Sequence, residues 1–362
     1  MMSSCDRENL VVCYKEAPVD DYLVEEIRNG WPEVHLINVG QKDLPDALLE
    51  ADYFCGHAKV PVDWEKIVQQ KRLRWIQSSA AGMDWCLVPP VIASDIEITT
   101  ASGALADQVA EHTLALLLAA RRNLHTFFSD QFDEQGVFFT CIEEKKRLSL
   151  PPGGYRNFKR VPTRDLTRNT VGIVGFGGVG RRLSQVLAAF QTRILTTDLF
   201  PSGKPDHVAE LWGPDRIDDL LAESDVVILC LPLNESTRYF IDAEKFAKMK
   251  AGVLFANVAR GALVKTNDLI AALTEGHLCG AVVDVTDPEP LPKDHPLWNA
   301  PNLIITPHVG GQAAWRFDTI NRLFLENIRR RKANAPLINR LSLEGKRLGF
   351  PLRNGETPLW VE

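Results

Sequence analysis

The sequence predicts an α/β fold with parallel sheets covered by helices, and three observations support that prediction. Short apolar runs alternate with helix-like segments along most of the 362 residues. Several of these runs are apolar throughout, as expected for strands that are buried on both faces. The chain is also long enough for about two domains at roughly 150 residues each.

The first third of the chain contains four strand-like runs. They are "LVVCY", "DYFCG", "LRWIQSS" and "IEITTAS", at residues 10–14, 52–56, 73–79 and 96–102. Residues 105–124 then carry apolar side chains at helical spacing and end in basic residues, so we expect a helix that joins two domains. The pattern breaks over residues 127–168, where the sequence "PPGG" forbids continuous regular structure, and a long connection is expected.

Composition and charge exclude several functional classes. Hydrophobic residues make up 45% and charged residues 24% of the chain, which is ordinary for a globular protein. The net charge of −6 does not attract nucleic acid or anionic membranes. There is no basic leader and no run of about 20 apolar residues, so we expect a soluble, cytoplasmic protein. The seven cysteines lack metal-ligand spacing, and we expect reduced thiols and no metal site.

The stretch "TVGIVGFGGVG" at residues 170–180 has the context of a dinucleotide-binding loop. An apolar strand precedes it, the amphipathic helix "RRLSQVLAAF" follows it, and an acidic residue ends the next strand. Gly175 would permit the tight turn, Gly177 would let the backbone approach a pyrophosphate, and Gly180 would let the helix pack closely on the strand. The phosphates would then lie at the N-terminus of the helix.

The acidic residue in this pattern is Asp198, about 20 positions beyond the loop. Its carboxylate can accept hydrogen bonds from both ribose hydroxyls of an adenosine, but it would repel a 2′-phosphate. Leu199 and Phe200 supply no cation that would offset this repulsion. The sequence therefore favours NAD, in its oxidised or reduced (NADH) form, over NADP.

Four more strand-like runs follow at residues 225–233, 252–261, 279–285 and 302–308. Polar side chains occur only where these runs stop, and they are Asn257, Arg260, Asp284, Glu289 and His308. In an open α/β sheet, ligands bind beyond the carboxyl ends of the strands. Three separate strand ends are therefore expected to bring an arginine, a glutamate and a histidine to one place.

Each of these three residues has an ordinary structural explanation by itself, but together beside a nucleotide loop they form a working set. Arg260 can hold the carboxylate of a 2-keto acid with two hydrogen bonds and polarise its carbonyl group. His308 can protonate the carbonyl oxygen during reduction and remove the proton during oxidation. Glu289 can orient the imidazole and favour its protonated form. This chemistry interconverts a hydroxy acid and a keto acid.

Several longer motifs occur in a characteristic order. They are "LRWIQSSAAGMD", "VAEHTLALLLAARR", "TVGIVGFGGVG", "LPLNESTRYFI", "FANVARGALV", "AVVDVTDPEPLP" and "IITPHVGG". This set, which covers most of the chain, resembles the D-isomer-specific 2-hydroxyacid dehydrogenases. That family includes glyoxylate/hydroxypyruvate reductases and phosphoglycerate dehydrogenases.

The resemblance implies two doubly wound parallel-sheet domains around a cleft. Residues 1–104, completed by 314–362, would form a flavodoxin-like substrate-binding domain. Residues 105–313 would form a Rossmann NAD-binding domain with an insert at about 127–168. The family is typically homodimeric through the NAD-binding domain, so a homodimer is expected.

The resemblance also assigns roles to residues. Arg260, Glu289 and His308 correspond to the catalytic triad, and Asp284 lies where the family binds the nicotinamide carboxamide. The backbone at Ala81 and Gly82 would receive the substrate carboxylate opposite Arg260. The full set of expected cofactor contacts is Gly175, Gly177, Gly178, Val179, Gly180, Asp198, Leu231, Pro232, Val258, Asp284, His308 and Gly310.

Departures from the family pattern bear on the substrate. The segment "QSSAAGMD" contains no Arg or Lys, which favours a small unphosphorylated acid such as glyoxylate or hydroxypyruvate. Glu289 stands where formate dehydrogenases of the same superfamily carry Gln. Asn234 replaces the more usual Thr of the "LPLT" motif.

Two alternatives remain open at this point. One is a phosphoglycerate dehydrogenase whose phosphate site uses Lys59, Lys66 or Arg72. The other is a non-catalytic, NAD-sensing binding protein similar to the transcriptional corepressors that resemble this family. Those proteins also keep the triad, but this sequence shows no recruitment motif that we can identify.

Overall fold

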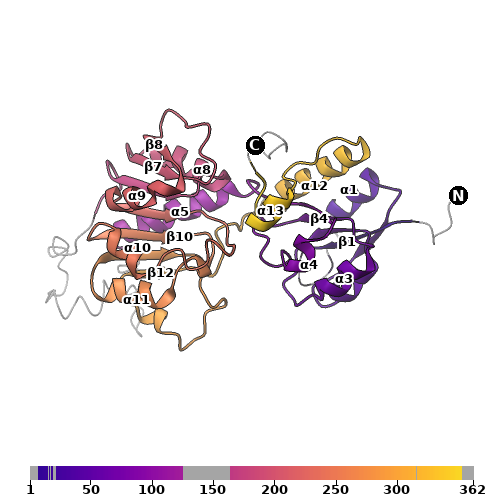
Figure 1. Ribbon diagram of the computed structural model, residues 1–362, viewed down its shortest axis with the longest axis horizontal. Helices are drawn as coiled ribbons and strands as arrows, with labels where there is room; N and C mark the ends of the chain where they lie inside the picture. The colour runs from indigo at the N-terminus through magenta and orange to yellow at the C-terminus, as the bar shows by residue number, and fades with distance from the viewer. Residues whose placement is uncertain are drawn as a thin grey trace, which may run out of the picture. The chain divides into compact units, whose positions relative to one another are not determined.

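The computed structural model describes residues 7–14, 16, 18, 22–124, 164–314 and 316–352. The chain divides into two compact units, which are coloured by residue number in Figure 1. Unit 1 comprises Met1–Ala106, Pro232–Thr237 and Gln312–Glu362, and unit 2 comprises Asp107–Leu231 and Arg238–Gly311. Most of the insert expected at about 127–168 lies outside the described residues.

Unit 1 is built on a parallel five-stranded sheet with the strand order β2-β1-β3-β4-β5. The strands are β1 (Asn9–Cys13), β2 (His35–Asn38), β3 (Tyr53–Gly56), β4 (Trp75–Ser78) and β5 (Glu97–Thr99). The helices are α1 (Tyr22–Gly30), α2 (Leu44–Leu49), α3 (Trp64–Gln70), α4 (Pro89–Ile92), α12 (Arg316–Lys332) and α13 (Leu343–Leu348). This strand order is that of flavodoxin-like sheets, as the sequence predicted.

Strand β1 shows how this sheet acquires helices on both faces. Leu10 and Val12 belong to the apolar core that includes residues of α1 and α12, whereas Val11 and Cys13 belong to a separate core under α2, α3 and α4. Successive side chains of a strand point to opposite faces, so an apolar run needs cover on both sides. Helices α1 and α12 lie side by side and supply that cover on one face (Figure 1).

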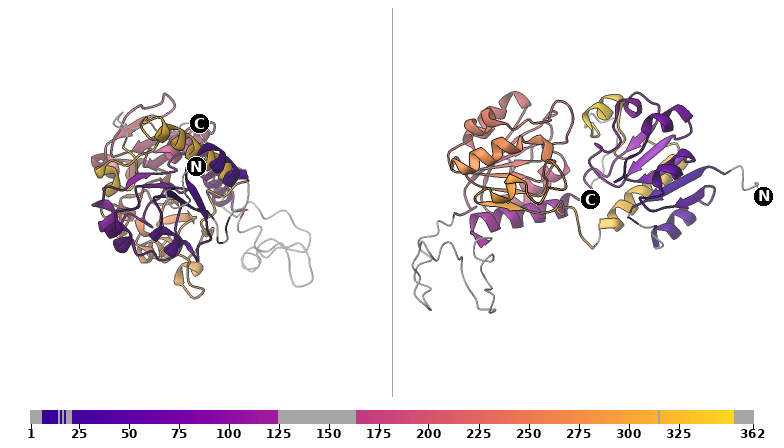
Figure 2. Two further views of the ribbon diagram at one scale, coloured as in Figure 1. Left: turned by 90° about the vertical axis from the view of Figure 1, so that its right-hand side faces the viewer. Right: turned by 90° about the horizontal axis from the view of Figure 1, so that it is seen from below.

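Unit 2 contains a parallel seven-stranded sheet with the order β12-β11-β10-β9-β6-β7-β8. The strands are β6 (Thr170–Val174), β7 (Arg193–Thr197), β8 (Glu210–Trp212), β9 (Val226–Leu229), β10 (Val253–Asn257), β11 (Leu278–Val283) and β12 (Leu303–Ile305). The helices are α5 (Ala106–Arg121), α8 (Gly178–Ala188), α9 (Ile217–Glu223), α10 (Ala243–Lys248) and α11 (Thr266–Thr274). Helices cover both faces of this sheet, as Figure 2 shows.

The central strands β9 and β10 are buried along their whole length. The strand order reverses beside β6, because the chain goes from β6 to β7 in one direction and later to β9 on the other side. Such a reversal is where doubly wound sheets bind ligands, at the carboxyl ends of the strands. Within the described ranges, no helix has the length and apolar character needed to cross a membrane.

The predicted fold class is confirmed in both sheets, and each predicted strand is present. Most are shorter than predicted, whereas β1 keeps the predicted length and begins one residue earlier. The predicted helix at 105–124 is confirmed as α5. Two strands were not predicted from the sequence, β2 and β8, which are short, partly exposed strands at sheet edges. An edge strand faces solvent along one side and needs no continuous apolar run.

Candidate active site

The predicted site residues of unit 2 follow the carboxyl ends of its parallel strands. Asp198 follows β7, Arg260 lies just beyond β10, Asp284 follows β11 directly, and His308 lies just beyond β12. The same edge also carries the predicted cofactor residues Leu231 after β9, Val258 after β10 and Gly310 after β12. Most of the predicted catalytic and cofactor-binding residues therefore lie at the carboxyl ends of the strands of this sheet.

The glycine loop between β6 and α8 has the geometry that a dinucleotide requires. Gly175 has a φ of 99°, which favours glycine, and a Cβ at Gly180 would overlap the carbonyl oxygen of Gly175. A Cβ at Gly177, in contrast, would meet nothing within 4 Å. No side chain caps the N-terminus of α8, which begins at Gly178 and continues through Val179. The loop leaves room and amide groups for a pyrophosphate, so it fits the cofactor.

Asp198 ties this loop to the end of β7. Its Oδ2 accepts a hydrogen bond of 2.7 Å from the Phe176 amide within the loop, and its Oδ1 accepts one of 2.9 Å from the Phe200 amide. Each carboxylate oxygen can accept more than one hydrogen bond. The carboxylate is therefore held in place with acceptor capacity left for ribose hydroxyls.

His308 and Glu289 form a close pair in unit 2. The Nδ1 atom of His308 lies 2.6 Å from Oε1 of Glu289, so the ring donates its Nδ1 proton to the carboxylate. Their side chains are 44% and 41% exposed, which leaves the pair accessible to a ligand. The second ring nitrogen, Nε2, is then the atom of His308 suited to exchange a proton with substrate.

The carboxyl group of Glu289 has a lowered pKa. Burial, the largest single effect, would raise this pKa, and the hydrogen bond and charge of His308 are the largest of the effects that together lower it. The Thr286 amide and the Arg260 charge add smaller effects in the same direction. Glu289 therefore carries its negative charge readily, and that charge faces the Nδ1 atom of His308.

Arg260 is placed near this pair by the turn that follows β10. The Asn257 side chain accepts from the Ala259 amide at 3.1 Å and donates to the Arg260 carbonyl at 2.8 Å, which fixes the turn. The next residue, Gly261, packs so tightly that an added Cβ would overlap the backbone of Thr286. The strand ends that carry Arg260 and Glu289 are thereby held together.

Asp284 is almost completely buried, with 2% exposure. Its Oδ1 accepts hydrogen bonds from the Thr306 hydroxyl at 2.6 Å and the Val309 amide at 2.9 Å. Its Oδ2 accepts from the Gly310 amide at 2.8 Å. His112 of α5 lies beside this group, with Nε2 3.3 Å from Oδ1 of Asp284. Neither His112 nor Thr306 was predicted as a site residue, although both lie in the quoted motifs "VAEHTLALLLAARR" and "IITPHVGG".

In unit 1, Ala81 and Gly82 lie in the turn after β4. A hydrogen bond from the Ala101 amide to the Ala80 carbonyl, 3.1 Å long, and a turn between Ser78 and Ala80 hold this segment. Neither the Ala81 nor the Gly82 amide donates a hydrogen bond to another described residue. Backbone amides of this kind at a strand end are suited to bind a carboxylate.

The segment Pro232–Thr237, which includes the predicted cofactor residue Pro232, belongs to unit 1 by its contacts. Asn234 explains this grouping. Its side-chain oxygen accepts from the Ser236 and Thr237 amides, and its side-chain nitrogen donates to the Leu348 carbonyl at 2.9 Å. A threonine could not make the full set, which gives the departure at Asn234 a structural reason.

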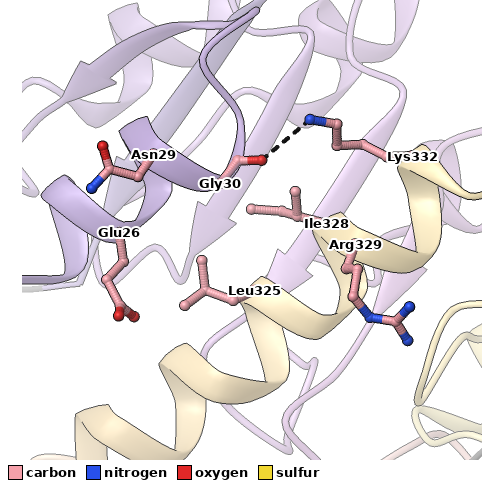
Figure 3. A pocket seen from close by; sticks show the side chains of 7 residues that line it. All are labelled: Glu26, Asn29, Gly30, Leu325, Ile328, Arg329 and Lys332. Carbon is pink, nitrogen blue, oxygen red and sulfur yellow. Dashed lines mark hydrogen bonds between the residues drawn. The ribbon is translucent and has the colours of Figure 1, made fainter.

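A separate groove lies between α1 and α12 in unit 1 (Figure 3). Leu325 and Ile328 form its apolar part, and Glu26, Arg329 and Lys332 lie around it. It is formed by the outer helices, whereas the predicted substrate residues Ala81 and Gly82 follow a strand of the sheet. None of the predicted site residues lines this groove.

A glycine loop beside the reversal point of a doubly wound sheet, with an acid and base pair on the same sheet edge, is the arrangement of a dinucleotide-dependent oxidoreductase. Comparison of the chain with known protein families and relatives identifies its family. Residues 114–310 match the model described as "D-isomer specific 2-hydroxyacid dehydrogenase, NAD binding domain". The chain belongs to the D-isomer-specific 2-hydroxyacid dehydrogenases, and unit 2 contains their NAD-binding domain.

Relatives named for an activity agree with this assignment. The chain is 30% identical to a glyoxylate reductase of Pyrococcus furiosus, over 80% of this chain and 82% of that protein. It is 30% identical to a D-3-phosphoglycerate dehydrogenase of Mycobacterium bovis, over 82% of this chain and 52% of that protein. A D-isomer-specific 2-hydroxyacid dehydrogenase from Xanthobacter autotrophicus, solved in complex with NADPH and MES, is 25% identical with a TM-score of 0.70, covering 94% and 99% of the two chains.

Proposed function

We propose that this protein reduces a small, unphosphorylated 2-keto acid such as glyoxylate or hydroxypyruvate with NADH, and catalyses the reverse oxidation. The observation that carries this proposal is the His308–Glu289 pair, whose nearest atoms are 2.6 Å apart and whose side chains are partly exposed. The pair lies beyond the carboxyl ends of the unit 2 strands, as the glycine loop does. Arg260 lies near enough for its charge to act on Glu289. Family membership makes the general reaction that of a 2-hydroxyacid dehydrogenase.

Each residue of the proposed triad has a separate task. Bound NADH supplies the hydride. Arg260 holds the substrate carboxylate and polarises the carbonyl group through its planar guanidinium. His308 donates a proton from Nε2 to the developing alkoxide, and Glu289 stabilises the charged ring through Nδ1. In oxidation, the neutral ring accepts the hydroxyl proton at the same atom.

We propose that the Ala81 and Gly82 amides bind the substrate carboxylate together with Arg260. We propose that Asp198 binds the adenosine ribose and that the loop glycines with Val179 hold the pyrophosphate. Asp284, Leu231, Pro232, Val258 and Gly310 complete the proposed cofactor contacts. Because the Asp198 carboxylate would repel a 2′-phosphate, we propose NAD rather than NADP, although three structures of similar fold were solved with NADPH or NADP.

The positions of the three basic residues considered for a substrate phosphate, Lys59, Lys66 and Arg72, favour an unphosphorylated substrate. Arg72 precedes β4 and pairs with Asp52, which precedes β3. Both therefore lie at the amino ends of the strands, whereas Ala81 lies beyond the carboxyl end of β4. Lys66 lies within α3. Lys59 follows β3, but its ammonium group pairs with Glu16 at 3.5 Å. Phosphoglycerate oxidation, the activity in the name of one relative, therefore remains the second candidate, with Lys59 as the cation best placed to serve it.

We also propose that the protein is cytoplasmic, from the composition of the chain, and that it is a homodimer, because members of the family are typically homodimers. Sedimentation of the purified protein at micromolar concentration tests the assembly. A single species at twice the monomer mass of 40.4 kDa is expected, and a monomer at every concentration would contradict the homodimer.

The proposed reaction is tested by the loss of NADH absorbance in parallel reactions with glyoxylate, hydroxypyruvate, pyruvate, a bulky aromatic 2-keto acid and phosphohydroxypyruvate. The His308→Ala variant is the control. We expect rapid turnover of a small unphosphorylated acid that disappears in the variant. Preference for phosphohydroxypyruvate would support the second candidate, and tight NADH binding without turnover of any acid would support a non-catalytic NAD sensor.

A further inference from the structure

The group around Asp284 connects helix α5 to the loop that carries His308. His112, in the middle of α5, lies with Nε2 3.0 Å from Oγ1 of Thr306 and 3.3 Å from Oδ1 of Asp284. Thr306 itself lies 2.6 Å from Asp284. Three residues from distant parts of the chain therefore share one small, largely buried hydrogen-bonded cluster.

Counting protons assigns the donors in this cluster. The Thr306 hydroxyl has one proton, and its short contact with the Asp284 carboxylate uses that proton. The contact between Thr306 and His112 must then use a proton on Nε2 of the ring. The same N–H faces the carboxylate, so His112 donates toward both Thr306 and Asp284. A hydrogen-bond donor at this position stabilises a buried carboxylate that would otherwise face only one side chain.

Asp284 uses its remaining acceptor positions to organise the backbone around His308. It accepts from the amides of Val309 and Gly310, the two residues after His308. Its own carbonyl group accepts from the His308 amide at 2.7 Å. His308 has a φ of 55°, a left-handed conformation that is unfavourable for a residue other than glycine. Such a conformation persists only where the surroundings hold it, and the Asp284 contacts supply that hold.

The loop also packs closely against the cluster. A Cβ added at Gly310 would lie 2.8 Å from Oδ2 of Asp284 and 3.3 Å from the His112 ring. The loop therefore has little space to move while the ring and carboxylate remain in place.

We propose that His112 is a positioning residue for the reaction. By donating from Nε2 to Thr306 and Asp284, it holds the Asp284 carboxylate where that group fixes the His308 backbone, and so sets the geometry of the His308–Glu289 pair. This inference rests on the proposed function for its catalytic consequence, but its structural part does not depend on turnover.

Two substitutions at His112 separate the donor from the bulk of the ring. Leucine fills a similar space without a donor, whereas the amide of glutamine can reach the Nε2 position with an N–H. We expect His112→Leu to lower kcat at least tenfold while the Kd for NADH changes less than threefold. We expect His112→Gln to recover most of kcat.

His277 offers a matched control in the same unit. Its Nε2 is 2.8 Å from the Phe246 carbonyl, before the start of β11 and therefore at the other end of that strand from Asp284. His277→Leu also removes one ring hydrogen bond, and we expect it to keep kcat within twofold. Equal kcat losses in His112→Leu and His277→Leu would overturn the proposal, as would failure of His112→Gln to recover activity at unchanged thermal stability.

Amide hydrogen exchange tests the same inference without catalysis. In the intact protein, the Val309 and Gly310 amides donate to Asp284 and should exchange slowly. We expect exchange in the peptide covering residues 306–314 to be at least tenfold faster in His112→Leu and unchanged in His277→Leu. Thr306→Val, which removes the hydroxyl link, should have the same effect if His112→Leu folds poorly.

The two readouts distinguish the two proposals. Faster exchange at 306–314 with no wild-type turnover of any keto acid would refute the proposed function and retain the link from His112 to the loop. Normal wild-type turnover, with exchange at 306–314 unchanged in His112→Leu and in Thr306→Val, would retain the proposed function and overturn the role of His112.

Discussion

The carboxyl ends of the two sheets carry very different side chains on similar parallel architectures. In unit 2, the residues after the strands include Arg260, Asp284 and His308. In unit 1, the turn after β4 reads "SAAGM" and offers small side chains and backbone amides. Because both sheets are parallel and covered by helices, this difference does not come from the fold. It resides in the few residues that follow each strand.

The polar groups within unit 1 are used differently. Gln77 and Thr99 are fully buried within its sheet, and the Gln77 side-chain oxygen accepts hydrogen bonds from the Thr99 hydroxyl and from Asn327 of α12. The His308–Glu289 pair of unit 2 is instead more than 40% exposed on each side chain. The comparison indicates that the buried polar groups of unit 1 maintain the fold, whereas the pair in unit 2 is accessible to a ligand.

Apart from the His308→Ala test described last, the largest effect is expected for Arg260→Ala. If Arg260 binds the substrate carboxylate and its carbonyl, its loss should raise KM and lower kcat together, and kcat/KM should fall about 10²–10³-fold. Steady-state kinetics with the preferred keto acid checks this. Arg260→Lys should lie in between, because an ammonium group cannot form the paired contact. Arg193→Ala, which removes a surface partner of Glu223 at the start of β7, is the control. Normal kinetics in Arg260→Ala would remove this residue from the site.

A stability effect of intermediate size is expected for Asn327→Leu. The Asn327 amide donates to Gln77 at 2.7 Å and accepts from the Ile338 amide at 2.7 Å, all in a buried setting. Leucine would leave these partners unsatisfied, and the free energy of unfolding should fall by about 2–4 kcal/mol. Urea unfolding measures this change, with the exposed Asn29→Leu as control. If Asn327→Leu unfolds at the wild-type urea concentration, unit 1 does not depend on this network.

The smallest effect is expected for Asp198→Ala. Removing the carboxylate should weaken NADH binding and relieve the repulsion of NADPH, so that the ratio of kcat/KM for NADH over NADPH falls about tenfold. Parallel assays with the two cofactors check it, and the exposed Asp206→Ala is the control. An unchanged ratio would refute the assigned ribose contact.

The sequence predicted the strands that carry a continuous apolar run and missed two that do not. The run of β12 was recognised although β12 is a partly buried edge strand. Strands β9 and β10 are apolar throughout and were recognised. Strands β2 and β8 have partly exposed side chains at sheet edges, and their short sequences carry no such signal.

The site residues could also be predicted from the sequence only where an apolar run marks a strand end. Arg260, Glu289 and His308 were predicted because each follows an apolar run, which places it at a strand end. His112 gave no such signal, because it lies in a helix and its hydrogen-bond partner Thr306 is 194 residues away. Only the three-dimensional arrangement brings these two residues together.

A single-turnover experiment tests the central claim that the His308–Glu289 pair of unit 2 is the catalytic centre. Wild-type protein and His308→Ala, each preloaded with NADH, are mixed with the keto acid that the wild type prefers, and NADH absorbance is followed. We expect both proteins to bind NADH with similar affinity and the rate in the variant to fall by about 10²–10⁴-fold, the usual contribution of a general acid. Equal rates in the two proteins would show that another group supplies the proton and would contradict this account.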